Sequence, residues 1–136
     1  MNAKTPKTIL VTGASSGFGQ QIALALAAAG HQVFGTSRKP QGDLGSADNP
    51  VRMLPLDVCD EDSVKKCLQL LTAQAARLDV LVNNAGSGLS GAIEDCSDTE
   101  TEWQMQTNFH GPLRMIRQIL PLMREQGHGR IITIGS

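Results

Sequence analysis

Short apolar runs rich in β-branched residues alternate with longer amphipathic stretches, and this alternation constrains the fold of the chain most. The apolar runs cover residues 8–12, 32–37, 51–58, 79–82 and 131–134. The stretches with helical character cover residues 20–30, 60–79 and 98–126. Continuous apolar strands that alternate with helices are typical of a parallel sheet covered on both faces. The sequence therefore predicts an α/β fold, a doubly wound parallel sheet over residues 1–136 that ends after its fifth strand.

Glycine and proline refine the expected boundaries. Gly30 is placed to end the first helix in the left-handed conformation. Pro55 lies inside the third apolar run and favours an edge position for that strand, because proline has no N–H to donate. Pro112 and Pro121 fall inside the last helical stretch. An interior proline costs a helix about 3 kcal/mol or more, so a kink or a break is expected there.

Composition excludes several classes of function. A length of 136 residues fits one domain, and a net charge of −1 gives no reason to expect nucleic acid or an anionic membrane as a partner. No apolar run is long enough to span a membrane, and no signal peptide is expected at the amino terminus. Cys59, Cys67 and Cys96 lack the close pairing of zinc sites, so we expect no metal. Reduced thiols favour a cytoplasmic location.

A glycine-rich turn follows the first apolar run. Gly13, Gly17 and Gly19 form the pattern G-x-x-x-G-x-G between an expected strand and an expected helix. Glycine allows a tight turn and the close approach of a pyrophosphate, and the helix start offers free N–H groups. Ser15 and Ser16 add hydroxyl donors. The pattern indicates a phosphate site, and an ordinary strand-to-helix turn is the alternative.

The second expected strand ends in two cations. Dinucleotide-binding folds that use NAD carry an acid about 20 residues after the glycine turn, where it accepts hydrogen bonds from the ribose 2′-hydroxyl. Here the strand ends in Ser37, Arg38 and Lys39, with no acid. Two cations suit a 2′-phosphate, so NADP(H) is favoured over NAD(H). A solvated basic pair in a loop is the alternative.

Five motifs in register carry a family resemblance. They are "TGASSGFG", "DV", "NNAG", the Asn of "TNFHG", and "GRIITIGS". Their order and spacing resemble the short-chain dehydrogenase/reductase family across nearly the whole chain. The resemblance implies a Rossmann-type fold, a dinucleotide cofactor, and NADP-dependent hydride transfer between an alcohol and a carbonyl. A small-molecule alcohol or carbonyl is then the substrate of the full-length parent.

The resemblance also assigns roles to cofactor-binding residues. Thr12 matches the position that braces the glycine turn. Asp57 and Val58 match the pair beside the adenine ring, although Asp57 could instead cap the following helix. The stretch that supports the central strand and lies along the cofactor is matched by Asn84, Ala85 and Gly86. The expected cofactor-binding residues are Gly13, Ser15, Ser16, Gly17, Phe18, Gly19, Ser37, Arg38, Asp57, Val58, Asn84, Ala85 and Gly86.

Two residues match active-site positions of the family. Asn108 is expected to hold a water through a backbone carbonyl freed by a distorted helical turn, and Ser136 is expected to hydrogen-bond the substrate oxygen. In the family a Tyr-x-x-x-Lys motif follows, whose tyrosine transfers the proton. This sequence contains no tyrosine. We therefore expect the chain to be an N-terminal part that is inactive alone.

Alternatives remain open at this point. A non-catalytic NADP-binding sensor or partner-binding module would keep the cofactor loop and dispense with the tyrosine. A nucleotide-using enzyme such as a methyltransferase is weaker, because its ligand's ribose usually pairs with an acid. A homo-oligomer formed through the long helix is plausible for the parent. The apolar side chains expected in the core or in such an interface are Trp103, Met105, Phe109, Leu113 and Ile116.

Overall fold

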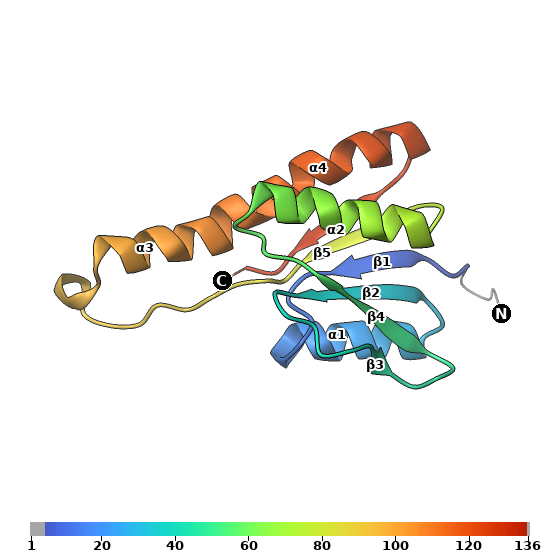
Figure 1. Ribbon diagram of the computed structural model, residues 1–136, viewed down its shortest axis with the longest axis horizontal. Coiled ribbons are helices and arrows are strands. Elements are labelled where there is room, and N and C mark those ends of the chain that lie inside the picture. The colour runs from blue at the N-terminus through green and yellow to red at the C-terminus, as the bar shows by residue number, and fades with distance from the viewer. Residues whose placement is uncertain (1–4, 136) are drawn as a thin grey trace.

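The structure, a computed structural model, describes residues 5–135 and has a six-stranded sheet with helices on both faces (Figure 1). The strands are β1 (Thr8–Val11), β2 (Gln32–Ser37), β3 (Leu44–Gly45), β4 (Pro50–Pro55), β5 (Val80–Asn83) and β6 (Arg130–Thr133). The helices are α1 (Gly17–Ala28), α2 (Glu61–Gln74), the 3₁₀ turn η1 (Ile93–Asp95), α3 (Asp98–Met105), the π-helix η2 (Gln106–His110) and α4 (Gly111–Gln126).

The strand order is β3-β4-β2-β1-β5-β6, and every pairing except that of β3 with β4 is parallel. The chain begins at β1, moves outward through β2 and β4, and then returns to the other side of β1 with β5 and β6. This confirms the doubly wound parallel sheet of Rossmann type. The direction of winding reverses between β1 and β5, so a crevice is expected beyond the carboxyl ends of these two strands.

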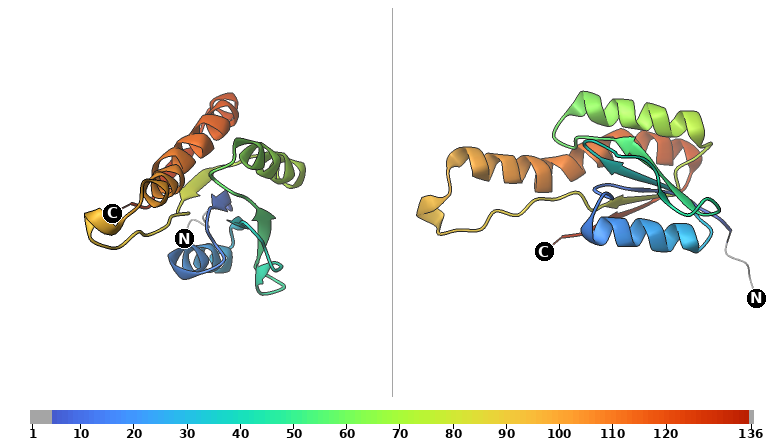
Figure 2. Two further views of the ribbon diagram at one scale, coloured as in Figure 1. Left: turned by 60° about the vertical axis from the view of Figure 1, so that its left-hand side comes forward. Right: turned by 60° about the horizontal axis from the view of Figure 1, so that its bottom comes forward.

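Alternate side chains of the strands point to opposite faces of the sheet and belong to two hydrophobic cores. α1 covers one face of the sheet, and α2 and α4 cover the other (Figures 1 and 2). Leu10, Phe34 and Leu81 pack with α2 and α4, whereas Ile9, Val11 and other neighbours in the strands pack with α1. This alternation has the period of two that a strand requires, and it explains why β1 and β5, which are buried on both faces, are mostly apolar.

The third expected strand differs in its bounds and in its neighbour. β4 ends at Pro55, so Leu56 to Val58 lie in the loop after it and not in the strand. The polar loop before β4 adds the two-residue antiparallel strand β3, which the sequence did not predict. Beside it, the Asp43 carboxylate accepts the Met53 N–H at 2.8 Å, which satisfies a donor on the outer edge of β4. β3 pairs with Pro50 and Val51 only, so Pro55 has no partner strand on that side among the described residues. Such a position suits proline, because it has no N–H to donate.

The last helical stretch forms one long rod from Asp98 to Gln126 in three parts, α3, η2 and α4. The distortion lies at η2, just before Pro112, while α4 continues through Pro121 without the break considered for that position. α3 extends past the carboxyl edge of the sheet (Figures 1 and 2). Trp103, Met105 and Phe109 are exposed on this part, so they do not belong to the core.

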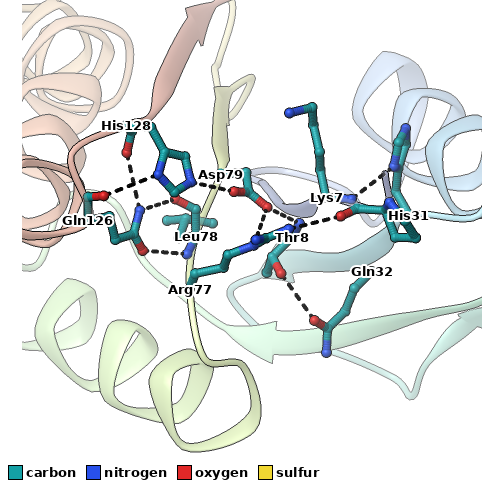
Figure 3. A network of polar contacts seen from close by, with 10 residues as sticks. Lys7, Thr8, His31, Gln32, Arg77, Leu78, Asp79, Gln126 and His128 are labelled. Atoms are coloured by element: carbon teal, nitrogen blue, oxygen red, sulfur yellow. Dashed lines mark hydrogen bonds and ion pairs between the residues drawn. The ribbon is translucent and has the colours of Figure 1, made fainter. Parts of the chain in front are cut away.

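A polar network ties together the amino-terminal ends of β1 and β5 (Figure 3). The buried Asp79 carboxylate accepts the Thr8 N–H at 2.7 Å, Arg77 Nε at 3.1 Å and His128 Nε2 at 2.8 Å. Burial alone would raise the pKa of Asp79, but these hydrogen bonds and the positive charge of Arg77 outweigh burial and hold that pKa below its ordinary value. The Gln126 side chain bonds both backbone groups of Leu78 and so adds the end of α4 to the network.

Within residues 5–135, no helix combines the length and the apolar character that crossing a membrane requires.

Candidate functional site

A cavity of about 530 Å³ opens at the carboxyl edge of the sheet, beyond the ends of β1, β2, β4 and β5. This is the place where the winding reverses, and the volume lies in the range of small-molecule sites. It is lined by Gly13, Ser15, Ser16, Thr36, Ser37, Arg38, Leu56, Asp57, Val58, Cys59, Asn84, Ala85, Gly86, Ser87, Trp103 and Thr107.

The glycine turn has a backbone that other residues would not adopt easily. Gly13 and Gly17 have φ values of +65° and +57°, in the left-handed region. A Cβ at Gly13 would lie 2.8 Å from Ala85 Cα, and one at Gly19 would lie 2.1 Å from the Gly13 carbonyl oxygen. Helix α1 begins at Gly17 with its first-turn N–H groups free of intrahelical acceptors, and Ser16 makes no side-chain cap. The start of α1 is therefore open for an anion.

Two side chains hold the ends of β1 and β5 together beneath this turn. The buried Thr12 hydroxyl accepts the N–H groups of Asn84 at 3.0 Å and Ala85 at 2.9 Å. The Asn84 amide in turn donates to the carbonyl oxygens of Thr12 and Gly13, both at 3.1 Å. The glycine turn and the "NNAG" segment are thus one cross-linked unit.

The end of β2 forms the basic side of the cavity. Thr36 is buried and binds the glycine turn, because its hydroxyl accepts the Gly13 N–H at 3.3 Å and its carbonyl accepts the Ala14 N–H at 2.8 Å. The Ser37 hydroxyl oxygen is buried without a hydrogen-bond partner among residues 5–135. Arg38 is exposed and lines the cavity. An unpaired hydroxyl beside a cation suits an anionic group.

The loop after β4 carries the expected adenine pair. Asp57 Oδ1 accepts the Cys59 N–H at 2.9 Å in a local turn. Asp57 does not cap α2, since the cap is Asp60, whose carboxylate accepts the Asp62 N–H at 2.9 Å. Within the part of the chain that the structure describes, the second carboxylate oxygen of Asp57 has no hydrogen-bond partner. It remains able to accept a bond from a ligand.

Asn108 lies in η2, so the distorted turn expected around it is present. Its side chain makes a paired contact with the loop after β5. Oδ1 accepts the Ser87 N–H at 2.8 Å, and Nδ2 donates to the Ser87 carbonyl at 2.7 Å. Pro112 has no N–H, so the Asn108 carbonyl cannot accept the usual α-helical hydrogen bond from four residues on.

The cavity brings together most of the residues that the sequence singled out. Gly17, Phe18, Gly19 and Asn108 are not part of its lining, and Phe18 is 80% exposed. Ser136 lies outside the described residues. The lining residues found here are Gly13, Ser15, Ser16, Ser37, Arg38, Asp57, Val58, Asn84, Ala85 and Gly86.

Sequence reasoning missed six lining residues, which are Thr36, Leu56, Cys59, Ser87, Trp103 and Thr107. Thr36, Leu56, Cys59 and Ser87 adjoin expected site residues, so their positions at strand ends could have indicated them. Trp103 and Thr107 lie one turn apart on the long rod, and the Thr107 hydroxyl donates to the Trp103 carbonyl at 3.0 Å. Thr107 adjoins the expected site residue Asn108 in "TNFHG", whereas no motif marks Trp103.

Comparisons with known proteins agree with this geometry. A family model for short chain dehydrogenases matches residues 7–136. The 3-ketodihydrosphingosine reductase of Bacteroides thetaiotaomicron is 46% identical over 131 residues, which are 96% of this chain and 47% of that protein. The 3-oxoacyl-[acyl-carrier-protein] reductase FabG of Escherichia coli is 37% identical over 133 residues, which are 96% of this chain and 54% of that protein.

Solved structures are similar to this chain in fold. The crystal structure of a short-chain dehydrogenase from Streptomyces avermitilis has a TM-score of 0.87 at 37% identity, with 98% of this chain and 50% of that one covered. The structure of ElxO with NADP bound has a TM-score of 0.87 at 29% identity, with 97% of this chain and 56% of that one covered. The chain thus spans about half the length of the relatives that it matches.

Proposed function

The chain belongs to the short-chain dehydrogenase family, and from this premise we propose that it is the cofactor-binding part of an NADP(H)-dependent oxidoreductase. The parent reaction is hydride transfer between the nicotinamide and a small-molecule alcohol or carbonyl. One observation carries the proposal: the cavity lies beyond the carboxyl ends of β1 and β5, where the winding of the sheet reverses, and it combines a glycine turn with an open helix start.

The residues present fit a dinucleotide. We assign the pyrophosphate to the glycine turn, where Gly13 and Gly19 allow the backbone to pack closely on Ala85 and Asn84. Gly13, Ser15 and Ser16 of this turn line the cavity. Asp57 and Val58 line the cavity, and we assign them to its adenine side. The lining segment that follows β5, Asn84 to Gly86, is assigned to the nicotinamide side.

The cofactor preference is proposed from the end of β2. Arg38 is the cation in the cavity lining, and β2 is followed by no acid that would bind a free ribose 2′-hydroxyl. A guanidinium matches a phosphate with several hydrogen bonds. The structural relative ElxO has NADP bound, which supports the same choice.

Asn108 and Ser136 are the proposed active-site residues. The bound nicotinamide supplies the hydride or accepts it. Asn108 is held by Ser87, and its carbonyl, freed by Pro112, is directed to a water in this proposal. Ser136 hydrogen-bonds the substrate oxygen. Because the sequence has no tyrosine to move the proton, we expect this chain to bind NADPH without reducing ketones. A role as an NADP-binding sensor would give the same two results.

Tryptophan fluorescence tests the proposed binding. Trp103 is the single tryptophan, the chain has no tyrosine, and this side chain lines the cavity. NADPH should therefore change the emission at low concentration, and NADH only at higher concentration. An emission that neither dinucleotide changes, in a protein with normal circular dichroism, contradicts the proposal. Steady NADPH-dependent reduction of a ketone would contradict only the expected lack of turnover and not the proposed binding.

The exposed apolar side chains on the long rod support one proposed partner, a second copy of the chain. Met105 and Phe109 are 45% and 53% exposed and lie close together in sequence. Sedimentation of the wild type and of a Phe109→Ser variant would test this contact. The unpaired thiols Cys59, Cys67 and Cys96 support a reducing, cytoplasmic setting.

A further inference from the structure

Arg114, on α4, lies outside the cavity lining and connects the loop after β4 to η2. Its Nη1 donates to the Val58 carbonyl at 3.2 Å and to the Gln106 carbonyl at 3.4 Å, and its Nη2 donates to Gln106 Oε1. Val58 belongs to the loop after β4, and Gln106 is the first residue of η2. One half-buried guanidinium therefore joins the adenine-side loop to the π-helical turn that carries Asn108.

The loop after β4 also contacts the long rod at two other points, one at the start of α4 and one in η2. A Cβ on Gly111 would lie 2.8 Å from Val58 Cγ2, so the start of α4 packs directly on this valine. The sulfur of Cys59 lies 3.4 Å from the Thr107 hydroxyl oxygen. These two contacts are apolar or weak. The hydrogen bonds from the charged Arg114 side chain are therefore the strongest of the contacts described between the loop and the rod.

The guanidinium is directed to carbonyl oxygens and not to an acid. The ion pairs found within residues 5–135 do not include Arg114. Glu102 is linked to it only indirectly, since the Gln106 amide nitrogen donates to Glu102 Oε1 at 2.7 Å. The Gln106 carbonyl also accepts the Gly111 N–H, which closes the π turn. Arg114 thus reinforces the irregular part of the rod, where the regular α-helical hydrogen bonds are replaced.

We propose that Arg114 is a positioning residue of the dinucleotide site, an inference that rests on the proposed function. Arg114 does not line the cavity. By holding the Val58 carbonyl it fixes the loop in which Val58 and Asp57 face the adenine side. By holding Gln106 it fixes η2, so that Asn108 keeps its paired contact with Ser87. One side chain therefore fixes the position of the loop after β4 relative to η2, the turn that carries Asn108.

The test compares matched variants on one helix. Arg114→Met removes the guanidinium, and Arg117→Met removes an exposed charge one turn away. Arg114→Met should weaken binding of NADPH and of 2′,5′-ADP about tenfold, the equivalent of about 1.4 kcal/mol. Arg114→Lys should recover part of the affinity, because an ammonium keeps the charge and can donate to the backbone carbonyls, but it lacks the second nitrogen that binds Gln106 Oε1. Arg117→Met should bind as the wild type does.

The outcomes separate this inference from the proposed function. Wild-type affinity in Arg114→Met overturns the inference and leaves the proposed function intact. A lower melting temperature with unchanged affinity also overturns it, because Arg114 would then serve stability only. If the wild type binds neither ligand, the proposed function fails and this inference fails with it. If Arg114→Met does not fold, Gln106→Leu takes its place, and unchanged affinity in that variant overturns the inference.

Discussion

The Thr12 hydroxyl accepts the backbone N–H of Ala85 at 2.9 Å, although 73 positions separate the two residues. The bond joins the ends of β1 and β5, which are the two strands between which the sheet reverses its direction of winding. A reversal leaves a gap beyond the strands, and the gap can bind a ligand only if its two sides keep a fixed separation. Thr12, which is buried next to the lining residue Gly13, fixes that separation.

Thr12→Val should destabilise the protein and weaken cofactor binding together. The substitution keeps the shape but leaves the N–H groups of Asn84 and Ala85 without their acceptor. We expect the free energy of unfolding to fall by about 2 kcal/mol. Urea unfolding and an NADPH titration measure the two effects. Thr12→Ser keeps the hydroxyl and is the control. Equal stability of the Val and Ser variants would contradict the role of this hydroxyl.

Gly19→Ala should lower both stability and NADPH affinity for a steric reason. The added Cβ would lie 2.1 Å from the Gly13 carbonyl oxygen and 2.3 Å from Asn84 Nδ2, so the helix or the turn must move. Overpacking of this kind costs about 2 kcal/mol, and the displaced turn should bind NADPH less well. Gly88→Ala, where a Cβ meets nothing within 4 Å, is the matched control. Thermal melting and the same titration would show whether only Gly19→Ala is impaired.

Sequence alone predicted the parts of this site that lie at strand ends. The glycine turn and Asn84 each follow an apolar run, Asp57 lies at the end of one, and the carboxyl ends of parallel strands meet at one edge of the sheet. Their approximate positions therefore follow from the alternation of strands and helices. The rule needs no knowledge of side-chain contacts.

The contribution of the long rod could not be predicted in the same way. A π turn inserts a residue into the helical repeat and rotates the residues on its two sides relative to each other. Periodicity across residues 98–126 therefore does not show that Trp103 and Thr107 line the cavity. Similarly, β3 is a two-residue pairing with β4, next to a side-chain contact from Asp43 to Met53, and no local pattern indicates either of them.

Arg38→Ala should change cofactor preference more than stability. Arg38 is exposed at the end of β2 and lines the cavity. Loss of its charge should weaken NADPH binding about tenfold, or about 1.4 kcal/mol. NADH affinity should change little, because NADH lacks the 2′-phosphate. Trp103 emission measures both affinities. Lys39→Ala, which changes a neighbouring cation outside the lining, is the control. An equal loss for NADPH and NADH would assign Arg38 a different role.

Asp79→Asn should reduce stability in a way that depends on pH. The hydrogen bonds from Thr8 and His128 and the charge of Arg77 outweigh burial and hold the pKa of Asp79 below its value in the unfolded chain, which is about 3.9. The folded state therefore binds the proton less readily than the unfolded state does. The contribution of the carboxylate is fully present above pH 4 and disappears as the pH falls through the folded-state pKa.

The wild type should accordingly exceed Asp79→Asn in unfolding free energy by about 2 kcal/mol at pH 7. The difference should shrink steadily below pH 4, because protonation then gives the wild type the same loss of charge. Urea unfolding at a series of pH values measures it. Asp48→Asn, which changes an exposed acid outside this network, should show no such trend. A difference between wild type and Asp79→Asn that stays constant down to pH 3 would show that charge is not what Asp79 contributes.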